Sequence, residues 1–354
     1  VAHNAGFDVG FIEQNCRVLG LEQEFTAVDT VALARVLLPT LSKYKLNLVA
    51  KALGISLENH HRAVDDAGAT AEIFVKFVEM LKDQHIMNLK EMNKFGDRNV
   101  NAIRKMPTHH IILIAQNDIG RYNLYQLITA SHMTYYARRP RIPKSLINEH
   151  REGIIIGSAC EAGELYRAVL EKQSAQQIAR LADFYDYYEI QPIGNDMFML
   201  EDEKTPNINT EEDLRNVNRE IVELGEKFGK PVVATCDVHF LDPEDEVYRR
   251  IIMAGKGFGD ADKQAPLYLR TTEEMLDEFA YLGSEKAYEV VIENPQKIAR
   301  MVEKISPVNP NKCPPVIADS DQELRDICYR KAHEMYGEDL PVQVSSRLEK
   351  ELNS

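Results

Sequence analysis

The sequence predicts an α/β fold, because short apolar runs typical of buried strands alternate with longer segments of helical periodicity. The strand-like runs occupy residues 110–115, 153–157, 187–190 and 231–236. Helices are predicted at residues 122–130, 161–170, 175–184 and 211–228. This alternation is typical of a parallel sheet or barrel whose strands are covered by helices.

A helical unit is predicted before this α/β part, over residues 1–83. Residues 10–19, 46–53 and 63–81 each place apolar side chains on one helical face. Residues 84–107 are polar and charged, so we expect them to form a linker between the helical unit and the α/β part.

The α/β part is expected to span residues 108–305. Prolines gathered over residues 307–315 indicate a second linker. Beyond it, charged helices are predicted at residues 321–336 and 344–352. Residues 306–354 are therefore expected to form a separate helical segment.

The composition limits the classes of protein to which the chain can belong. A chain of 354 residues is long enough for two or three domains, and its 44% hydrophobic and 28% charged residues are typical of a globular protein. No apolar run is long enough to span a bilayer, so no membrane partner is expected. The net charge of -14 argues against nucleic-acid binding by bulk electrostatics, so any DNA contact must be local or come from other domains.

The cysteines and the first residue add two expectations. The five cysteines are scattered without a CxxC pair, which predicts neither disulfides nor a zinc ribbon and favours a reducing cytoplasm. The chain opens at Val1 and enters a motif at once, so we expect it to be an internal piece of a longer protein.

Two short segments of the helical unit carry candidate catalytic residues. Residues 3–8 (HNAGFD) place Asp8 at the start of a helix, and residues 61–66 (HRAVDD) do the same for His61 and Asp66. Phosphodiester hydrolysis by two divalent ions needs carboxylate ligands and a base for the attacking water. Asp8 and Asp66 are candidate metal ligands and His61 is the candidate base. Taken singly, either segment is more simply explained as a helix cap or a chance pair.

A second group of candidate metal ligands follows regular elements of the α/β part: His132, Cys160, Asp237 and His239. Loops after parallel strands are where barrels place their sites, and imidazole, thiolate and carboxylate together suit Zn²⁺, Mn²⁺ or Fe. Other interpretations remain open. Cys160 fits a small core residue, His132 fits a cation at a helix C-terminus, and Asp237-Val238-His239 fits a turn.

Taken together, the HNAGFD and HRAVDD segments resemble the second and third motifs of the DEDDh exonuclease family, with Asp29-Thr30 also similar to that family. The resemblance implies an RNase H-like domain of which residues 1–83 form the C-terminal part. It also implies 3′ to 5′ hydrolysis of DNA ends, with Mg²⁺ or Mn²⁺ bound partly by Asp8 and Asp66. The family's first motif, an Asp-x-Glu pair, is absent from residues 1–83, so we expect this chain alone to be inactive.

Four segments of the α/β part resemble the later portion of the PHP domain of PolC-type replicative DNA polymerases: residues 139–143 (RPRIP), 157–165 (GSACEAGEL), 234–240 (ATCDVHF) and 269–275 (LRTTEEM). The resemblance implies a partial PHP barrel with His132, Cys160, Asp237 and His239 as the later ligands of a metal cluster. The earlier His-x-His ligands are absent from the sequence, which puts metal occupancy in doubt.

The resemblance implies a piece of a replicative DNA polymerase that proofreads, with residues 306–354 leading toward the polymerase palm. Its implied partners are the primer 3′ end, dNTPs and replisome proteins such as a sliding clamp. Two other classes stay open: a stand-alone PHP-type phosphoesterase, and a non-catalytic replisome scaffold. An internal His-x-His strand would favour the phosphoesterase, and the sequence contains none.

Overall fold

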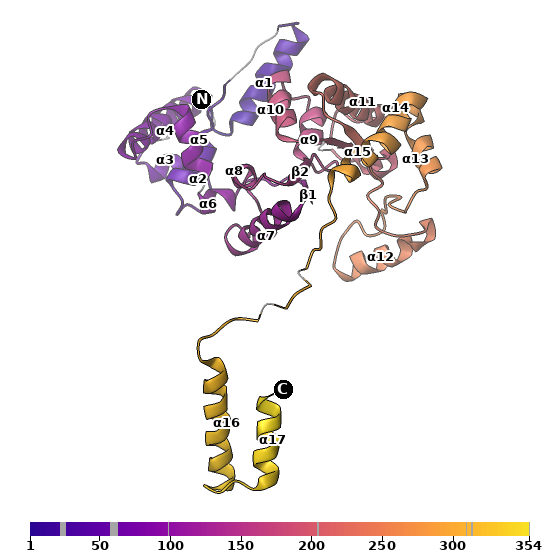
Figure 1. Ribbon diagram of the computed structural model, residues 1–354. Coiled ribbons are helices and arrows are strands. Elements are labelled where there is room, and N and C mark those ends of the chain that lie inside the picture. The colour runs from indigo at the N-terminus through magenta and orange to yellow at the C-terminus, as the bar shows by residue number, and fades with distance from the viewer. Residues whose placement is uncertain are drawn as a thin grey trace. The chain divides into compact units, whose positions relative to one another are not determined.

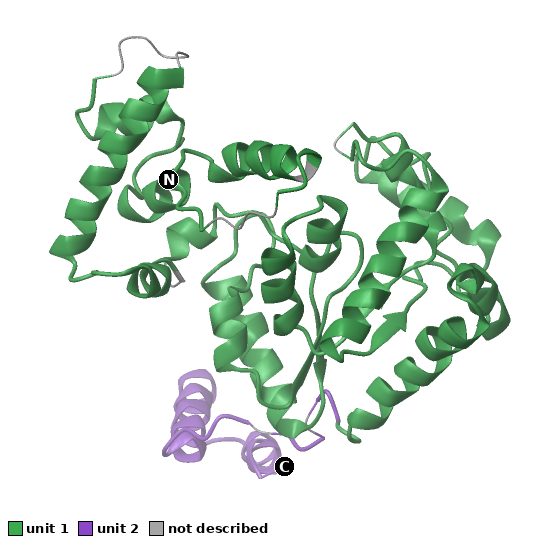
Figure 2. Cartoon of the chain, turned by 90° about the horizontal axis from the view of Figure 1, so that it is seen from above, with its two compact units in different colours: residues 1–305 green, residues 306–354 purple. Residues whose placement is uncertain are grey.

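The computed structural model describes residues 1–21, 26–56, 63–97, 99–203, 205–308, 310–312 and 314–353, without the side chains of Arg17 and Asp97 (Figure 1). The chain divides into two compact units, residues 1–305 and 306–354 (Figure 2). Within the described ranges, no helix is both long and apolar enough to cross a membrane.

The first hundred residues of the larger unit are helical. Their helices are α1 (Ala5–Val18), α2 (Thr30–Leu37), α3 (Leu46–Ala52), α4 (Ala63–Asp83), α5 (Leu89–Asp97) and α6 (Val100–Ile103). On α4, Ile73, Phe77 and Leu81 are buried against α2 and α3, so the predicted helical stripe is the core face of this helix.

Residues 84–107, predicted as a linker, hold α5 and α6. Most of these residues are polar, but α5 has a short apolar face. Its Met92 and Phe95 pack against the core formed by α2 to α4. Asn99 caps α6 by accepting a hydrogen bond from Ala102 N at 2.9 Å. A short helix needs few apolar residues when those residues pack against a neighbouring core.

The α/β prediction is confirmed, and each of the four predicted strand runs contains a strand. The strands are β1 (Ile112–Ala115), β2 (Ile154–Gly157), β3 (Tyr188–Ile190) and β4 (Val232–Ala234). β3 and β4 pair in parallel, and a parallel bridge joins Gly157 to Tyr187. β1 and β2 pair antiparallel, which differs from the parallel sheet predicted from the sequence. Gln116 N donates to Gly153 O, so the end of β1 lies beside the start of β2.

Helices accompany these strands, and most of the helices contribute residues to one buried core shared with the strands. They are α7 (Asp118–Met133), α8 (Lys144–Glu149), α9 (Glu164–Leu170), α10 (Ala175–Phe184), α11 (Glu211–Phe228), α12 (Glu246–Gly255), α13 (Thr272–Glu278), α14 (Ser284–Tyr288) and α15 (Asn294–Met301). Figure 1 shows α7 beside β1, with which it packs. Side chains of Tyr188, Leu165 and Phe279 are fully buried in this core.

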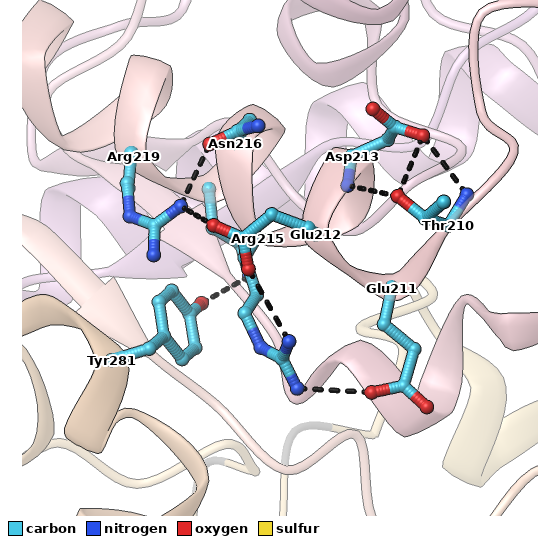
Figure 3. A network of polar contacts seen from close by, with 9 residues as sticks. Thr210, Glu211, Glu212, Asp213, Arg215, Asn216, Arg219 and Tyr281 are labelled. Atoms are coloured by element: carbon cyan, nitrogen blue, oxygen red, sulfur yellow. Dashed lines mark hydrogen bonds and ion pairs between the residues drawn. The ribbon is translucent and has the colours of Figure 1, made fainter.

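Polar contacts fix the start of α11 and attach it to the segment before α14 (Figure 3). Thr210 and Asp213 form a reciprocal capping box that satisfies the first backbone donors of the helix. One turn later, the guanidinium carbons of Arg215 and Arg219 lie 5.8 and 5.2 Å from the centre of the Tyr281 ring. Each such cation–π contact contributes roughly 0.5–1 kcal/mol at an exposed position.

The smaller unit is a pair of helices, α16 (Ser320–Tyr336) and α17 (Val342–Leu352), close to the predicted bounds. Arg325 on α16 donates to Glu349 on α17 at 3.0 Å and to Asn353 at 2.6 Å. These contacts join the two helices.

Candidate functional site

The segment before α1 is fastened to two other parts of the chain. The backbone of Ala2 bridges that of Asp29, and the His3 ring nitrogens lie 2.9 Å from Thr30 Oγ1 and 2.9 Å from Tyr44 O. Burial lowers the pKa of His3 below its usual value, which favours the neutral ring. The first residues of the HNAGFD segment are therefore fixed relative to α2.

Asp29 has two roles in that arrangement. Its Oδ1 accepts from Val31 N at 2.8 Å, which caps α2, and from Asn4 N at 3.0 Å. Asn4 adopts a left-handed conformation with φ of 74°, which asparagine tolerates better than most residues. Asp29 thus joins a single backbone bridge to the cap of α2.

The two candidate carboxylates begin different helices. Asp8 lies in the first turn of α1 and is exposed, and Asp66 lies in the first turn of α4 and is half-buried. The hydroxyl of Thr70 donates to Asp66 O at 2.8 Å, one turn along the helix. His61 lies outside the described residues, so the base proposed for this site has no described position.

In the α/β part, the Cys160 thiol lies next to a histidine that sequence reasoning did not select. His110 Nδ1 is 3.3 Å from Cys160 Sγ. Both residues line a cavity of about 240 Å³, together with Glu189 and Asp237. Burial raises the pKa of the Cys160 thiol to about 12, so the thiol is protonated at neutral pH in the absence of a metal ion.

The Asp237-Val238-His239 segment follows β4 in a sharp turn. Asp237 has a φ of 54°, and His239 Nδ1 lies 2.8 Å from the Asp237 carbonyl oxygen. The side chains of Asp237 and His239 remain 40% and 41% exposed, with His239 Nδ1 3.9 Å from Asp237 Oδ1. The turn leaves both side chains open to solvent.

His132 has a different environment. It lies in the last turn of α7, where its ring stacks on that of Tyr136 with centroids 6.2 Å apart. His132 is not among the residues that line the cavity of Cys160. Across the described ranges, no three His, Cys, Asp or Glu side chains are gathered closely enough to hold a metal ion.

Glu189 is the second residue that sequence reasoning missed. It lies in the middle of β3, is 6% exposed, and accepts hydrogen bonds from Thr235 Oγ1 at 2.7 Å and Gln191 Nε2 at 3.0 Å. Burial raises its pKa above the usual value. A carboxylate between Tyr188 and Ile190 inside an apolar run is itself a signal, because acidic residues are seldom buried without a role.

Comparison with known proteins identifies what these segments are similar to. A family model described as "Exonuclease" matches residues 1–74. The whole chain is 56% identical to part of DNA polymerase III PolC-type of Clostridium perfringens, covering 24% of that protein. The resemblance to PolC-type DNA polymerases is confirmed. PolC-type polymerases of Caldanaerobacter subterraneus and Oceanobacillus iheyensis are 50% and 41% identical over the whole chain, which covers 25% of each. The chain thus spans about a quarter of the length of these PolC-type relatives.

Proposed function

We propose that the chain is part of a replicative, DNA-directed DNA polymerase that also proofreads by 3′ to 5′ exonuclease action. The match of the whole chain to about a quarter of a PolC-type polymerase is the observation that carries this proposal. Residues 1–83 would form the later part of an RNase H-like exonuclease domain, and 108–305 the later part of a PHP barrel. Residues 306–354 would lead toward the polymerase palm. The parent would act on primer 3′ ends and dNTPs in the cytoplasm, with replisome partners such as a sliding clamp.

In the exonuclease domain, Asp8 and Asp66 would bind Mg²⁺ or Mn²⁺, and His61 would accept a proton from the attacking water. Divalent ions at such a site stabilise the charge that develops on the phosphate oxygens. The positions of Asp8 and Asp66 in first helical turns support this assignment, since both side chains project from the ends of elements. The bonds among His3, Asn4 and Asp29 would keep the start of α1 in place.

Joining this chain to the upstream exonuclease segment of a PolC-type relative is expected to produce Mg²⁺- or Mn²⁺-dependent degradation of single-stranded DNA from the 3′ end. Asp66→Asn should abolish this activity, because a neutral amide oxygen binds a divalent cation more weakly than a charged carboxylate does. Gel analysis of an end-labelled oligonucleotide gives the measurement. The exposed Asp321→Asn, on α16, serves as the matched control. Activity that survives Asp8→Asn and Asp66→Asn together would refute the proposed site.

In the PHP part, we propose that Cys160, Asp237 and His239 form part of a site for Zn²⁺, Mn²⁺ or Fe. We also propose that His110, and not His132, is the histidine that binds the metal beside Cys160. The distance of 3.3 Å between His110 Nδ1 and Cys160 Sγ supports His110 as the ligand. These donors suit such ions. His239 does not line the cavity, and no three of these side chains are gathered closely enough among the described residues to hold an ion, so further ligands or a rearrangement would be needed.

Zinc binding is expected to release about one proton per ion at pH 7, because coordination requires the Cys160 thiolate and the free thiol is protonated. Calorimetry in two buffers of different ionisation enthalpy measures the proton count. Cys160→Ser and His110→Ala should weaken binding, and Cys328→Ser and His132→Ala should leave it unchanged. Equal losses of zinc affinity in His110→Ala and His132→Ala would contradict the choice of His110 over His132 as the ligand.

A further inference from the structure

One stretch of this acidic chain is strongly basic. Residues 99–144 contain seven Lys and Arg residues and one acidic residue, Asp118, a local net charge of +6 in a chain of net charge -14. A phosphate-binding surface needs such clustering, and the charge of the whole chain does not exclude it.

Hydrogen bonds bring two parts of this stretch together. Arg104 Nη2 donates to Thr134 O at 2.8 Å, and the half-buried Arg141 donates to the carbonyl oxygens of Ile103 and Met106. Arg141 therefore has a structural role, because its guanidinium holds the end of α6 against the loop after α7. The same contacts bring residues 103–106 next to residues 134–141.

Four of the cations are exposed at this junction: Arg104, Lys105, Arg138 and Arg139, named here the basic strip. Elsewhere in the stretch, Arg121 pairs with Asp118 and Lys144 with Glu164. In the described parts of the chain, no acidic side chain pairs with a member of the basic strip. Unneutralised arginines at an exposed surface are the groups that bind phosphate oxygens, by paired N–H donors.

An aromatic platform borders the basic strip. Tyr136 is 48% exposed, its hydroxyl donates to Arg138 O at 3.3 Å, and its ring stacks at 19° on the ring of His132. Unpaired bases stack on exposed aromatic rings beside cationic grooves in proteins that bind single strands. Duplex DNA offers no free base face to such a platform.

The basic strip also reaches the helical unit that holds the proposed exonuclease residues. Lys105 Nζ donates to Leu41 O at 3.0 Å and to the Tyr44 hydroxyl at 2.8 Å. Tyr44 O in turn contacts His3 Nε2 at 2.9 Å. A strand bound along the basic strip would thus lie near the segment that leads into α1.

We propose that the basic strip, with Tyr136 and His132 as its stacking platform, binds single-stranded DNA. The arginines hold the phosphate backbone and the rings hold a base. Binding itself needs neither metal nor catalysis. Only the further step, that the bound strand is delivered to the exonuclease site, rests on the proposed function.

Fluorescence anisotropy of a labelled 20-nucleotide oligo(dT), titrated with the full chain in EDTA at several salt concentrations, tests the proposal. Arg138→Glu/Arg139→Glu is expected to lower affinity at least tenfold and to reduce the salt slope by about 1.4, at roughly 0.7 per phosphate contact on a single strand. Tyr136→Ala should lower affinity about five- to a hundredfold with an unchanged salt slope, since stacking releases no counterion. Arg330→Glu/Lys331→Glu, an adjacent exposed basic pair on α16, is the matched control.

Three results would overturn the proposal: no binding of oligo(dT) by the full chain, equal losses in the Arg138/Arg139 and Arg330/Lys331 variants, or equal affinity for a blunt duplex. Binding of an acidic peptide at the basic strip in place of oligo(dT) would identify a protein partner and would also refute it. Circular dichroism melting of each variant separates loss of contact from loss of fold. Because the assay contains no metal, its outcome is independent of whether the exonuclease proposal holds.

Discussion

His61→Ala, in a protein that joins this chain to the upstream exonuclease segment of a PolC-type relative, is expected to lower DNA degradation by ~10²–10⁴-fold. A positioned imidazole takes the proton of the attacking water, and alanine cannot. Affinity for the DNA should change little, because His61 is proposed to act on the water and not on the strand. Single-turnover kinetics with an end-labelled oligonucleotide separate the rate of hydrolysis from binding.

The adjacent His60 provides a matched control, since His60→Ala removes the same side chain one position away. A base also predicts a pH dependence, with activity rising as the imidazole loses its proton and levelling above its pKa. Loss of the rising limb in His61→Ala, with its retention in His60→Ala, is the expected pattern. Equal losses in both variants would show that the histidines act on the fold or on the metal site instead.

Much of the α/β fold follows from local sequence. Residues 175–184 and 211–228 form α10 and α11 with the predicted bounds, because each begins at a capping box and carries a clear apolar stripe. α5 and α12 were not predicted. α12 buries no residue, so it has no core-facing stripe to detect, and α5 presents only a narrow apolar face.

The contact between His110 and Cys160 in the candidate site could not be predicted from the sequence. Cys160 was selected because it follows a strand run, whereas His110 begins one, and a histidine at the start of a strand run carries no pattern of its own. Their contact depends on the antiparallel register that pairs Ile112 with Gly157. Strand register is set by tertiary packing and cannot be derived from the spacing of apolar residues alone. Family resemblance suggested Asp237 and His239 as candidate ligands without that information.

Asp196 is a buried acid of the α/β part and provides a test of the fold that needs no metal. It is 3% exposed, and its Oδ2 accepts a hydrogen bond from the Tyr166 hydroxyl at 2.9 Å. Its Oδ1 has no hydrogen-bond partner among the described residues. Burial, with a smaller contribution from Glu161, raises the pKa of Asp196 from 3.8 to about 7.

This raised pKa predicts how stability depends on pH. The folded state favours the protonated acid, so the contribution of Asp196 to stability is fully present below its unfolded pKa of 3.8 and is lost as pH rises through about 7. The loss amounts to ~4 kcal/mol for a shift of about three pKa units. Asp196→Asn keeps an acceptor for Tyr166 without a titrating group, so this variant should be the more stable protein at pH 8. Urea unfolding of both proteins from pH 4 to 8 measures the difference, with Asp321→Asn as an exposed control. Parallel curves for wild type and Asp196→Asn would show that folding does not raise the pKa of Asp196, and would contradict this prediction.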